Sequence, residues 1–465
     1  MNILGKNKNT STARPSVSRK QQVAPLPGGP ASGNAAGAAG SASPEVLVSR
    51  RRFLYGAIGA GAVAAVGIGA FAYNSAVNAN NDEVEYLDAP KSSLTTLNDF
   101  EAIENAEELV QKVGEFDLPY GTLVWTNDDE IAACLLPTET GSPLTQVGLL
   151  YLGSGNTTTV LKRAQGSSDG FEIYDVRANG NGIVWTEANI LQGEWRIYAA
   201  TLSESAGTIG EPILLEEGGS AYETPTLAVV GSRAFWQVNP KQVDENMPTA
   251  RLMGATFGKN DASIVLESNR RMSSPPYAYE DTVTVAPRID SGPYYQLTNI
   301  DAKTGEVRET LTLPNAIKPI EGGYGKTGFM FSFPDIYDYK GAIANLGTYT
   351  PQSLPSNGDY NGARWFNFTR TPTAAPAWCD NLLIVKSTYS VCGVDLEKST
   401  YFALDVDDGA DTYGEYLAST GNNNTFVTYT NIDHTPVGAA RTYACRVKVY
   451  APVSQTSSSR STVQV

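Results

Sequence analysis

The chain has 465 residues, of which 41% are hydrophobic and 18% are charged, and these proportions exclude a wholly disordered protein. Its net charge of −15 is unevenly spread, because residues 1–54 hold eight Lys or Arg and one acid, which leaves −22 on the remainder. A body this acidic is repelled by nucleic acid, so we exclude a nucleic-acid partner.

Cysteine and histidine are scarce. The chain has four cysteines and one histidine, His434, and it contains no CxxC, CxxCH or HExxH motif. Zinc, haem and iron–sulfur sites need such ligands at characteristic spacings. We therefore expect no resident cofactor, with calcium as the one ion left open.

An export signal is the most specific feature of the sequence. Residues 49–55 read Ser49-Arg50-Arg51-Arg52-Phe53-Leu54-Tyr55, which resembles the twin-arginine translocation motif S-R-R-x-F-L-K at every position except the last. An uncharged run rich in Gly and Ala follows over residues 53–73, and as a helix its 21 residues would span about 31 Å, enough to cross a bilayer.

This resemblance implies export with the twin-arginine translocase as a partner. We predict a disordered cytoplasmic tail over 1–48, which is rich in Gly, Ala and Ser, and a signal or transmembrane segment over 49–79. Small residues at 70–72 and 77–79 are typical of cleavage sites, so secretion after cleavage stays open. The length of the tail favours a retained anchor with the C-terminal body outside the membrane.

A linker is predicted over 80–114. Within it, apolar residues from Leu97 to Val113 recur every three or four positions, which predicts an amphipathic helix over 97–113. We expect this helix to pack on the body that follows, with binding to a partner as the alternative.

The body, 115–453, repeats a pattern of short apolar strands separated by Gly, Asn, Asp and Pro. The repeat opens on strands that contain Trp125, Trp185 and Trp236, and weaker copies contain Val285, Phe331, Val385 and Tyr429, so that the copies recur every 44–60 residues. Several short strands per repeat of this length predict an all-β fold, a β-propeller. Seven copies predict seven blades, and six or eight stay open because the later copies are weak.

The body thereby resembles the TolB-like and WD-like bacterial propellers. The resemblance depends on the recurring order of strands and turns in the repeats, and it implies a fold and no particular activity. The final stretch, 454–465, is rich in Ser and Thr and is predicted to be a disordered tail.

Two groups of residues are candidate sites. Four acids after a predicted strand could offer oxygen ligands to calcium, although the spacing departs from that of an EF-hand; they are Asp405, Asp407, Asp408 and Asp411. The cysteines could form disulfides outside the membrane, where such bonds persist; the candidate pairs are Cys379 with Cys392 and Cys134 with Cys445. For the acids the alternative is a solvated turn, and for the cysteines it is free buried thiols.

No nucleophile with its base, metal cluster or cofactor loop can be recognised in the sequence. We therefore predict a non-catalytic binding or interaction module in the cell envelope, whose ligand is an envelope protein or a glycan. The alternative is an extracellular carbohydrate-active hydrolase or lyase with carboxylates in the propeller channel, because 48 acids in the exported part leave room for a catalytic pair.

Overall fold

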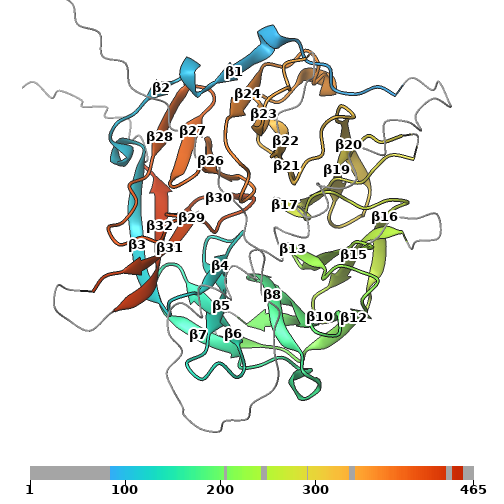
Figure 1. Ribbon diagram of the computed structural model, residues 1–465, viewed down its shortest axis with the longest axis vertical. Helices are drawn as coiled ribbons and strands as arrows, with labels where there is room; N and C mark the ends of the chain where they lie inside the picture. The colour runs from blue at the N-terminus through green and yellow to red at the C-terminus, as the bar shows by residue number, and fades with distance from the viewer. Residues whose placement is uncertain are drawn as a thin grey trace, which may run out of the picture.

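The computed structural model describes residues 84–203, 207–241, 249–290, 292–334, 341–435 and 442–453. These residues form seven sheets arranged in a ring around a central axis (Figure 1), so the predicted all-β propeller is confirmed. The predicted tails, 1–48 and 454–465, and the predicted signal segment, 49–79, lie outside the described residues. Within the described part, no helix is long and apolar enough to span a membrane.

We number the sheets 1 to 7 in chain order. Sheet 1 consists of β4 (Leu123–Trp125), β5 (Ile131–Pro137), β6 (Thr145–Tyr151) and β7 (Thr157–Leu161). Sheet 2 consists of β8 (Glu172–Asn179), β9 (Gly182–Asn189), β10 (Glu194–Ser203), β11 (Thr208–Ile209) and β12 (Ile213–Gly218). Sheet 3 consists of β13 (Thr226–Val230), β14 (Arg233–Val238), β15 (Ala250–Thr256) and β16 (Ser263–Ser268). Sheet 4 consists of β17 (Tyr277–Tyr279), β18 (Thr282–Val285), β19 (Gln296–Asp301) and β20 (Val307–Thr312).

The last three sheets also take strands from the N-terminal part of the described chain. Sheet 5 consists of β21 (Glu321–Gly325), β22 (Gly328–Phe333), β23 (Gly347–Pro351), β24 (Trp365–Phe368) and β1 (Leu94–Thr96). Sheet 6 consists of β25 (Ala377–Cys379), β26 (Leu382–Lys386), β27 (Val391–Asp395), β28 (Thr400–Ala403), β2 (Glu101–Ala102) and β30 (Asn422–Asn423). Sheet 7 consists of β29 (Tyr416–Leu417), β31 (Phe426–Asp433), β32 (Tyr443–Pro452) and β3 (Val110–Leu118).

The core is divided among the interfaces between neighbouring sheets. Each sheet is buried on both faces, so successive residues of one strand serve different interfaces. In β5, for example, Ala133 packs between sheets 1 and 2, whereas Ala132 and Cys134 pack between sheets 7 and 1. An apolar cluster of this kind fills each of the seven interfaces in the described part of the ring. Face-to-face stacking therefore buries what one small sheet would expose.

The three tryptophans that mark the first repeats lie on two different strand positions of their sheets. Trp185 and Trp236 are fully buried on β9 and β14, the second strands of their sheets. Trp125 lies instead on the first strand, β4, where the guanidinium of Arg177 covers its ring at 4.6 Å. The second strand of sheet 1 is β5, so the first predicted repeat was aligned one strand too early.

The ring is closed by strands from both ends of the described chain. β3 pairs antiparallel with β32 and forms the outer strand of sheet 7. The preceding residues, 84–109, which we call the strap, run along the outside of sheets 4 to 6 (Figure 1). In the strap, Leu87 N donates to Thr312 O at 2.9 Å, β1 pairs parallel with β24, and β2 pairs parallel with β28.

The predicted helix over 97–113 is wrong. This stretch contains the 3-10 turns η2 (Leu97–Asp99) and η3 (Ala106–Glu108), the strand β2 and the start of β3. Only two of its apolar side chains are buried, and they serve different interfaces, since Phe100 packs between sheets 5 and 6 and Val110 between sheets 6 and 7, whereas Val113 is 53% exposed. The outer edges of β24 and β28 offer backbone hydrogen bonds to the strap, and pairing with these edges is favoured over an isolated helix. The other 3-10 turns are η1 (Lys91–Ser93), η4 (Ser167–Asp169) and η6 (Ser356–Gly358).

Candidate axial pocket

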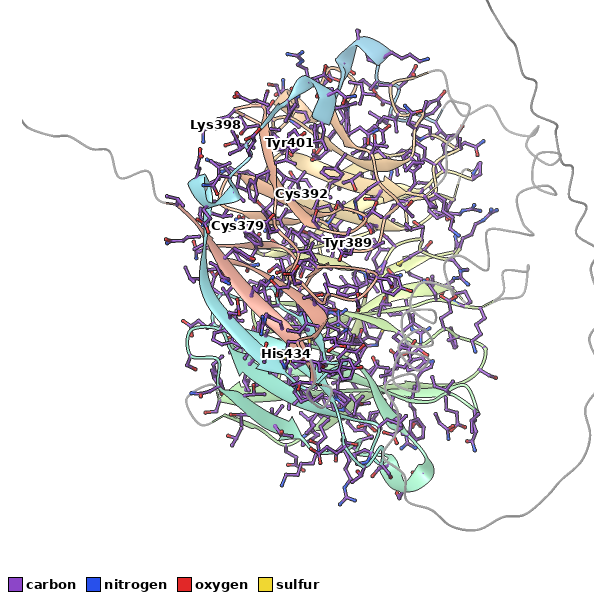
Figure 2. The ribbon with its side chains drawn as sticks, turned by 60° about the vertical axis from the view of Figure 1, so that its left-hand side comes forward. Cys379, Tyr389, Cys392, Lys398, Tyr401 and His434 are labelled. Atoms are coloured by element: carbon purple, nitrogen blue, oxygen red, sulfur yellow. The ribbon has the colours of Figure 1, made fainter. Side chains whose placement is uncertain are left out.

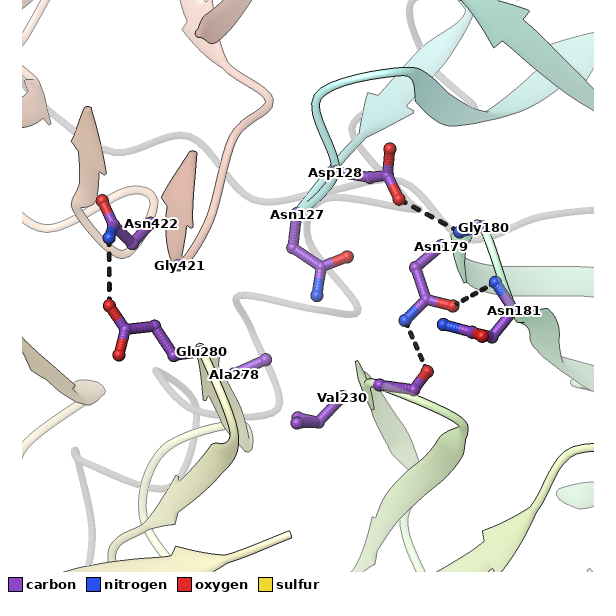
Figure 3. A pocket seen from close by; sticks show the side chains of 11 residues that line it. Asn127, Asp128, Asn179, Gly180, Asn181, Val230, Ala278, Glu280, Gly421 and Asn422 are labelled. Carbon is purple, nitrogen blue, oxygen red and sulfur yellow. Dashed lines mark hydrogen bonds between the residues drawn. The ribbon is translucent and has the colours of Figure 1, made fainter. Parts of the chain in front are cut away.

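The inner strands of neighbouring sheets carry their following turns to one end of the central axis. Residues at the ends of β4, β8, β13 and β17 meet there around a cavity of about 280 Å³, which we call the axial pocket (Figure 3). The pocket is lined by Asn127, Asp128, Asn179, Gly180, Asn181, Val230, Gly231, Ala278, Glu280, Gly421 and Asn422. Most of these side chains are polar, and four of them are asparagines.

One wall of the pocket comes from residues 418–425, which we call the crossing segment. Its backbone hydrogen bonds reach three other sheets: Thr126 N to Ala418 O at 3.1 Å, Thr420 N to Thr126 O at 2.8 Å, Trp378 N to Gly421 O at 2.7 Å, and Gly421 N to Tyr277 Oη at 3.1 Å. Gly421 has a φ of +74°, and a Cβ there would lie 3.0 Å from Ala278 O. A glycine therefore lets the crossing segment approach sheet 4.

Asp129 anchors the C-terminal end of the crossing segment. Its two carboxylate oxygens accept four hydrogen bonds: from Asn424 N at 3.1 Å, Asn424 Nδ2 at 2.7 Å, Thr425 N at 2.9 Å and Thr425 Oγ1 at 3.1 Å. Hydrogen bonds to a charged acceptor are the stronger kind. This contact fixes the crossing segment against the first turn of sheet 1.

The pocket presents amide groups and an exposed carboxylate. Two asparagines donate one side-chain N–H to a backbone carbonyl, Asn127 Nδ2 to Val229 O at 2.8 Å and Asn179 Nδ2 to Gly231 O at 2.9 Å. Asn422 Nδ2 donates to Glu280 Oε1 at 3.1 Å (Figure 3). The side-chain oxygens of Asn127 and Asn422 accept no hydrogen bond from the described residues. Each of these amides keeps a second N–H, so the cavity presents both donors and acceptors, and its charge comes from the two carboxylates that line it.

The two acids that line the pocket differ in the hydrogen bonds that they accept. Asp128 accepts from three backbone N–H groups: Gly180 N at 3.0 Å, Glu130 N at 2.8 Å and Ile131 N at 3.3 Å. Glu280 is exposed, adopts a φ of +50°, and accepts from Asn422 Nδ2 and not from any backbone N–H given above. Burial, and then the negative charge of Glu280, raise the pKa of the neighbouring Tyr279. Asp128 therefore holds a turn, whereas Glu280 offers its charge to the cavity.

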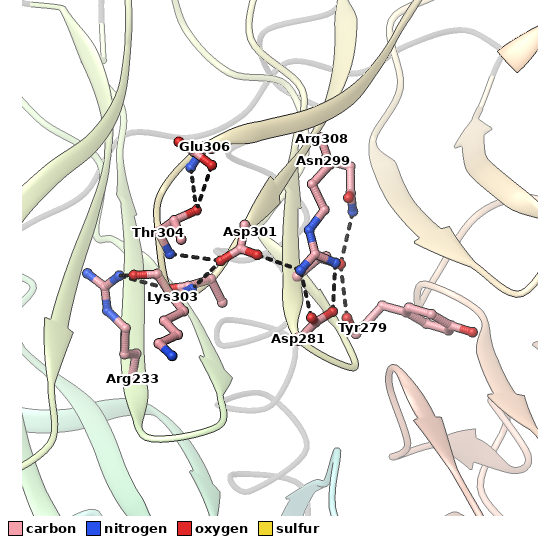
Figure 4. A network of polar contacts seen from close by, with 11 residues as sticks. Arg233, Tyr279, Asp281, Asn299, Asp301, Lys303, Thr304, Glu306 and Arg308 are labelled. Carbon is pink, nitrogen blue, oxygen red and sulfur yellow. Dashed lines mark hydrogen bonds and ion pairs between the residues drawn. The ribbon is translucent and has the colours of Figure 1, made fainter. Parts of the chain in front are cut away.

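An ion-pair network fixes the turn that carries Glu280. Asp281, the next residue, accepts from Arg308 Nη1 at 2.8 Å and from Arg308 Nη2 at 2.6 Å, and Arg308 also pairs with Asp301 (Figure 4). These hydrogen bonds from Arg308 lower the pKa of the Asp281 carboxyl. Asp301 in turn accepts from the backbone N–H groups of Lys303 and Thr304 within the β19–β20 turn. Because Arg308 pairs with both Asp281 and Asp301, it ties the β17–β18 turn to the β19–β20 turn.

The four candidate cysteines are buried, and no disulfide joins any of them in the structure. Cys379 and Cys392 lie on opposite faces of sheet 6 (Figure 2), since Cys379 packs towards sheet 7 and Cys392 towards sheet 5. This pairing is therefore wrong for the ring as folded. Cys134 and Cys445 do share the cluster between sheets 7 and 1, and burial followed by the nearby Cys445 raises the pKa of Cys134.

The candidate calcium acids are not gathered around one point. Asp407 pairs with Lys448 Nζ at 2.7 Å, and Asp411 accepts from Tyr413 N at 2.9 Å and Asn431 Nδ2 at 3.3 Å. Asp405 and Asp408 are exposed. The described residues contain no cluster of three or more acidic, His or Cys side chains that could hold a metal ion. His434 is exposed at the end of β31 (Figure 2).

Sequence reasoning did not identify the residues of the axial pocket as a site. The signal was present in the turn Asn179-Gly180-Asn181 and in the run Asn422-Asn423-Asn424, but both are typical of ordinary turns. Only the ring brings turns from sheets 1 to 4 to one axis. The fold and the pocket together define a β-propeller with a polar site at one axial end.

No protein-family model matches the chain, and no curated protein matches it. Several solved structures are similar in fold. One of two prolyl endopeptidases has a TM-score of 0.44 at 9% identity, with 73% of this chain and 47% of that chain covered. The Dos1 propeller has a TM-score of 0.42 at 10% identity, with 74% and 95% covered. An oligogalacturonate lyase in complex with manganese has a TM-score of 0.40 at 8% identity, with 76% and 96% covered. The chain thus spans about half the length of the prolyl endopeptidase, and these likenesses concern the fold alone.

Proposed function

We propose that this propeller is a non-catalytic binding module of the cell envelope, and that its axial pocket takes a positively charged group of its ligand. The observation that carries this proposal is the exposed carboxylate of Glu280 at the wall of a cavity that also presents amide oxygens. A ligand with several N–H donors and a positive charge satisfies such acceptors best. The net charge of −22 on residues 55–465 attracts a basic ligand at longer range.

The size of the pocket supports a side-chain-sized group. About 280 Å³ is at the small end of ligand sites, which span roughly 300–1,000 Å³. We therefore favour a lysine or arginine side chain of an envelope protein as the natural occupant. A glycan that carries an amino group has the same chemistry and is the alternative source.

The rival function, a carbohydrate-active hydrolase or lyase, needs two carboxylates with different proton-transfer roles. The two acids that line the axial pocket are Asp128 and Glu280. Asp128 accepts three backbone hydrogen bonds and holds a turn, so it is poorly placed to exchange protons with a substrate. This arrangement favours binding over turnover.

Titration calorimetry at low ionic strength tests the pocket, with arginine amide as the probe and citrulline amide as its uncharged counterpart. We expect arginine amide to bind and citrulline amide to bind much more weakly. Glu280→Gln keeps the shape and removes the charge, so it should weaken arginine amide binding about tenfold, the effect of roughly 1.4 kcal/mol. The matched control is Glu108→Gln, an exposed acid on the strap. Equal affinity in both variants would contradict the proposed site.

We also propose that the module is exported through the twin-arginine translocase and anchored by residues 53–73. The support is the motif at Ser49–Leu54 and the apolar run that follows it. Fractionation of the full chain with a C-terminal tag tests this. A full-length membrane product whose body is digested by external protease supports the anchor, whereas a shortened soluble product supports release. Replacement of Arg50, Arg51 and Arg52 by Lys should block export, and unchanged export would refute this route.

A further inference from the structure

The strap enters the ring at the end of the central axis opposite to the axial pocket, which we call the distal end. The inner strands run towards the pocket, so the strands that pair with them return to the distal end. β20 ends there at Thr312, whose carbonyl accepts from Leu87 N at 2.9 Å. The ring of Tyr86 stacks on that of Tyr294, 5.6 Å away, in the loop between β18 and β19 at the same end.

The start of the strap is close in sequence to the proposed membrane anchor. The anchor ends at residue 73 and the described chain begins at residue 84, and the eleven residues 74–84 span at most about 40 Å when fully extended. With the distal end towards the bilayer, this tether attaches directly. With the axial pocket towards the bilayer, it would also have to run along the depth of the ring, about 26 Å for the 8 residues of β8. The tether therefore holds the distal end at the higher effective concentration near the membrane.

The β9–β10 turn presents two aliphatic side chains at the distal end. Ile190 is 45% exposed and Leu191 is 98% exposed. The turn is fixed, because Gly193 N donates to Asn189 O at 2.8 Å and Asn189 Nδ2 donates to Asp169 O at 3.2 Å. Single exposed aliphatic residues are common, but two adjacent ones at the tip of a fixed hairpin suit contact with an apolar phase.

Two exposed tyrosines lie at the distal end on the other side of the ring. Tyr389 in the β26–β27 turn is 47% exposed, and Tyr413 in the segment before β29 is 50% exposed. Their backbones are fixed, because Glu415 N donates to Tyr389 O at 2.9 Å and Lys386 Nζ donates to Tyr413 O at 2.9 Å. A tyrosine side chain has an apolar ring and a polar tip, and such residues are enriched where a membrane meets water.

These groups are spread around the ring, on sheet 2, on sheet 4 beside Tyr86, and on sheets 6 and 7. Three separate contacts define a plane across the distal end. The net charge of −22 on residues 55–465 disfavours anionic lipid, so apolar and aromatic contact has to provide the attraction. We propose that the distal end docks on the headgroup interface of a zwitterionic bilayer, with Leu191 inserted, so that the axial pocket faces away from the membrane. This inference depends on the anchor in the proposed function.

Fluorescence quenching on the full chain in phosphatidylcholine liposomes tests this orientation. An environment-sensitive fluorophore is placed on one introduced cysteine, and nitroxide-labelled phosphatidylcholine is the quencher. The distal probes are Leu191→Cys and Thr388→Cys, both at exposed positions. The matched control is Leu354→Cys, which is 58% exposed in the loop after β23, at the end that carries the axial pocket. We expect quenching at both distal probes to exceed that at the control by about twofold or more, because interfacial side chains lie about 5–10 Å into the headgroup region.

Two controls accompany the probes. The four native cysteines are buried, and the chain without an introduced cysteine measures any labelling of them. Circular dichroism of each variant confirms that the ring is folded. Addition of phosphatidylglycerol should not increase quenching at position 191, and an increase would show docking by charge and contradict the apolar contact.

Flotation of the liposomes separates failure of the docking from failure of the anchor. A chain that does not float with the liposomes refutes the anchor and the docking together. A chain that floats, with equal quenching at positions 191 and 354, keeps the anchor and overturns the docking. Protection of position 191 from soluble iodide without quenching by the labelled lipid would mean that a protein covers the distal end, and this result also overturns the proposal.

Discussion

The interface between sheets 6 and 7 contains a charged group whose removal has a calculable cost. Lys448 Nζ lies 2.6 Å from Glu415 Oε1 and 2.7 Å from Asp407 Oδ1. The side chains of Lys448 and Glu415 are 3% and 1% exposed, whereas that of Asp407 is 26% exposed. We consider the substitution Lys448→Met, which keeps the length of the side chain and removes its charge.

The variant leaves the carboxylate of Glu415 buried without its cation. Loss of one partner from a buried ion pair costs about 3–5 kcal/mol of unfolding free energy. Burial already raises the pKa of Glu415, and Lys448 opposes that shift, so the variant should raise this pKa further. Protonation at lower pH then removes the buried charge, and the loss of stability should be smaller at pH 5 than at pH 7.

Urea unfolding followed by circular dichroism measures these differences. The control is Lys398→Met, because Lys398 lies 3.0 Å from Asp395 but is itself 57% exposed (Figure 2). The Asp395 carboxylate, which is 5% exposed, keeps its hydrogen bonds from Glu397 N and Lys398 N in this variant, so we expect a smaller loss than in Lys448→Met. The double variant Lys448→Met/Glu415→Leu should recover most of the loss. If Lys448→Met costs no more than Lys398→Met, or if the double variant is no more stable than the single one, the reasoning about this buried pair is refuted.

Four further predictions concern the anchor of the pocket, the closure of the ring by β3 and two buried titratable groups. Asp129→Ala should cost about 1–3 kcal/mol in urea unfolding and weaken arginine amide binding, because four hydrogen bonds to the crossing segment are lost; unchanged binding would show that Asp129 does not position Asn422. A chain that begins at residue 110 should keep the ring, whereas one that begins at 119 loses β3, exposes the edge of β32 and should aggregate in size-exclusion chromatography; equal behaviour would contradict closure by β3. Burial lowers the pKa of Lys386 to about 8, so the unfolded chain binds more protons above pH 8 and the stability of wild type relative to Lys386→Met should rise from pH 8 towards 10. Burial raises the pKa of Cys379 to about 12, so the stability of wild type relative to Cys379→Ala should fall as pH rises above 9, and parallel pH profiles would contradict both assignments.

The sequence predicts the sheets of the ring better than it predicts the strap that runs along their outer edges. Runs such as Ile183–Trp185 are apolar on both faces and recur at regular intervals, and a stack of small sheets is the arrangement that buries both faces of such strands. The strap is different, because its residues adopt the conformation that the free edges of β24 and β28 offer. Nothing within 97–113 encodes those edges, and the spacing of its apolar residues therefore predicted a helix that does not form.

The candidate sites, too, could be predicted from the sequence only in part. The cysteines were paired from their positions along the chain, and the pairing of Cys134 with Cys445 anticipated that the first and last sheets meet. Cys379 and Cys392 are closer in sequence, yet the alternation of side chains in β25 and β27 places them on opposite faces. Asn127 and Glu280 are far apart in sequence and are ordinary turn residues, so only the ring geometry makes them neighbours.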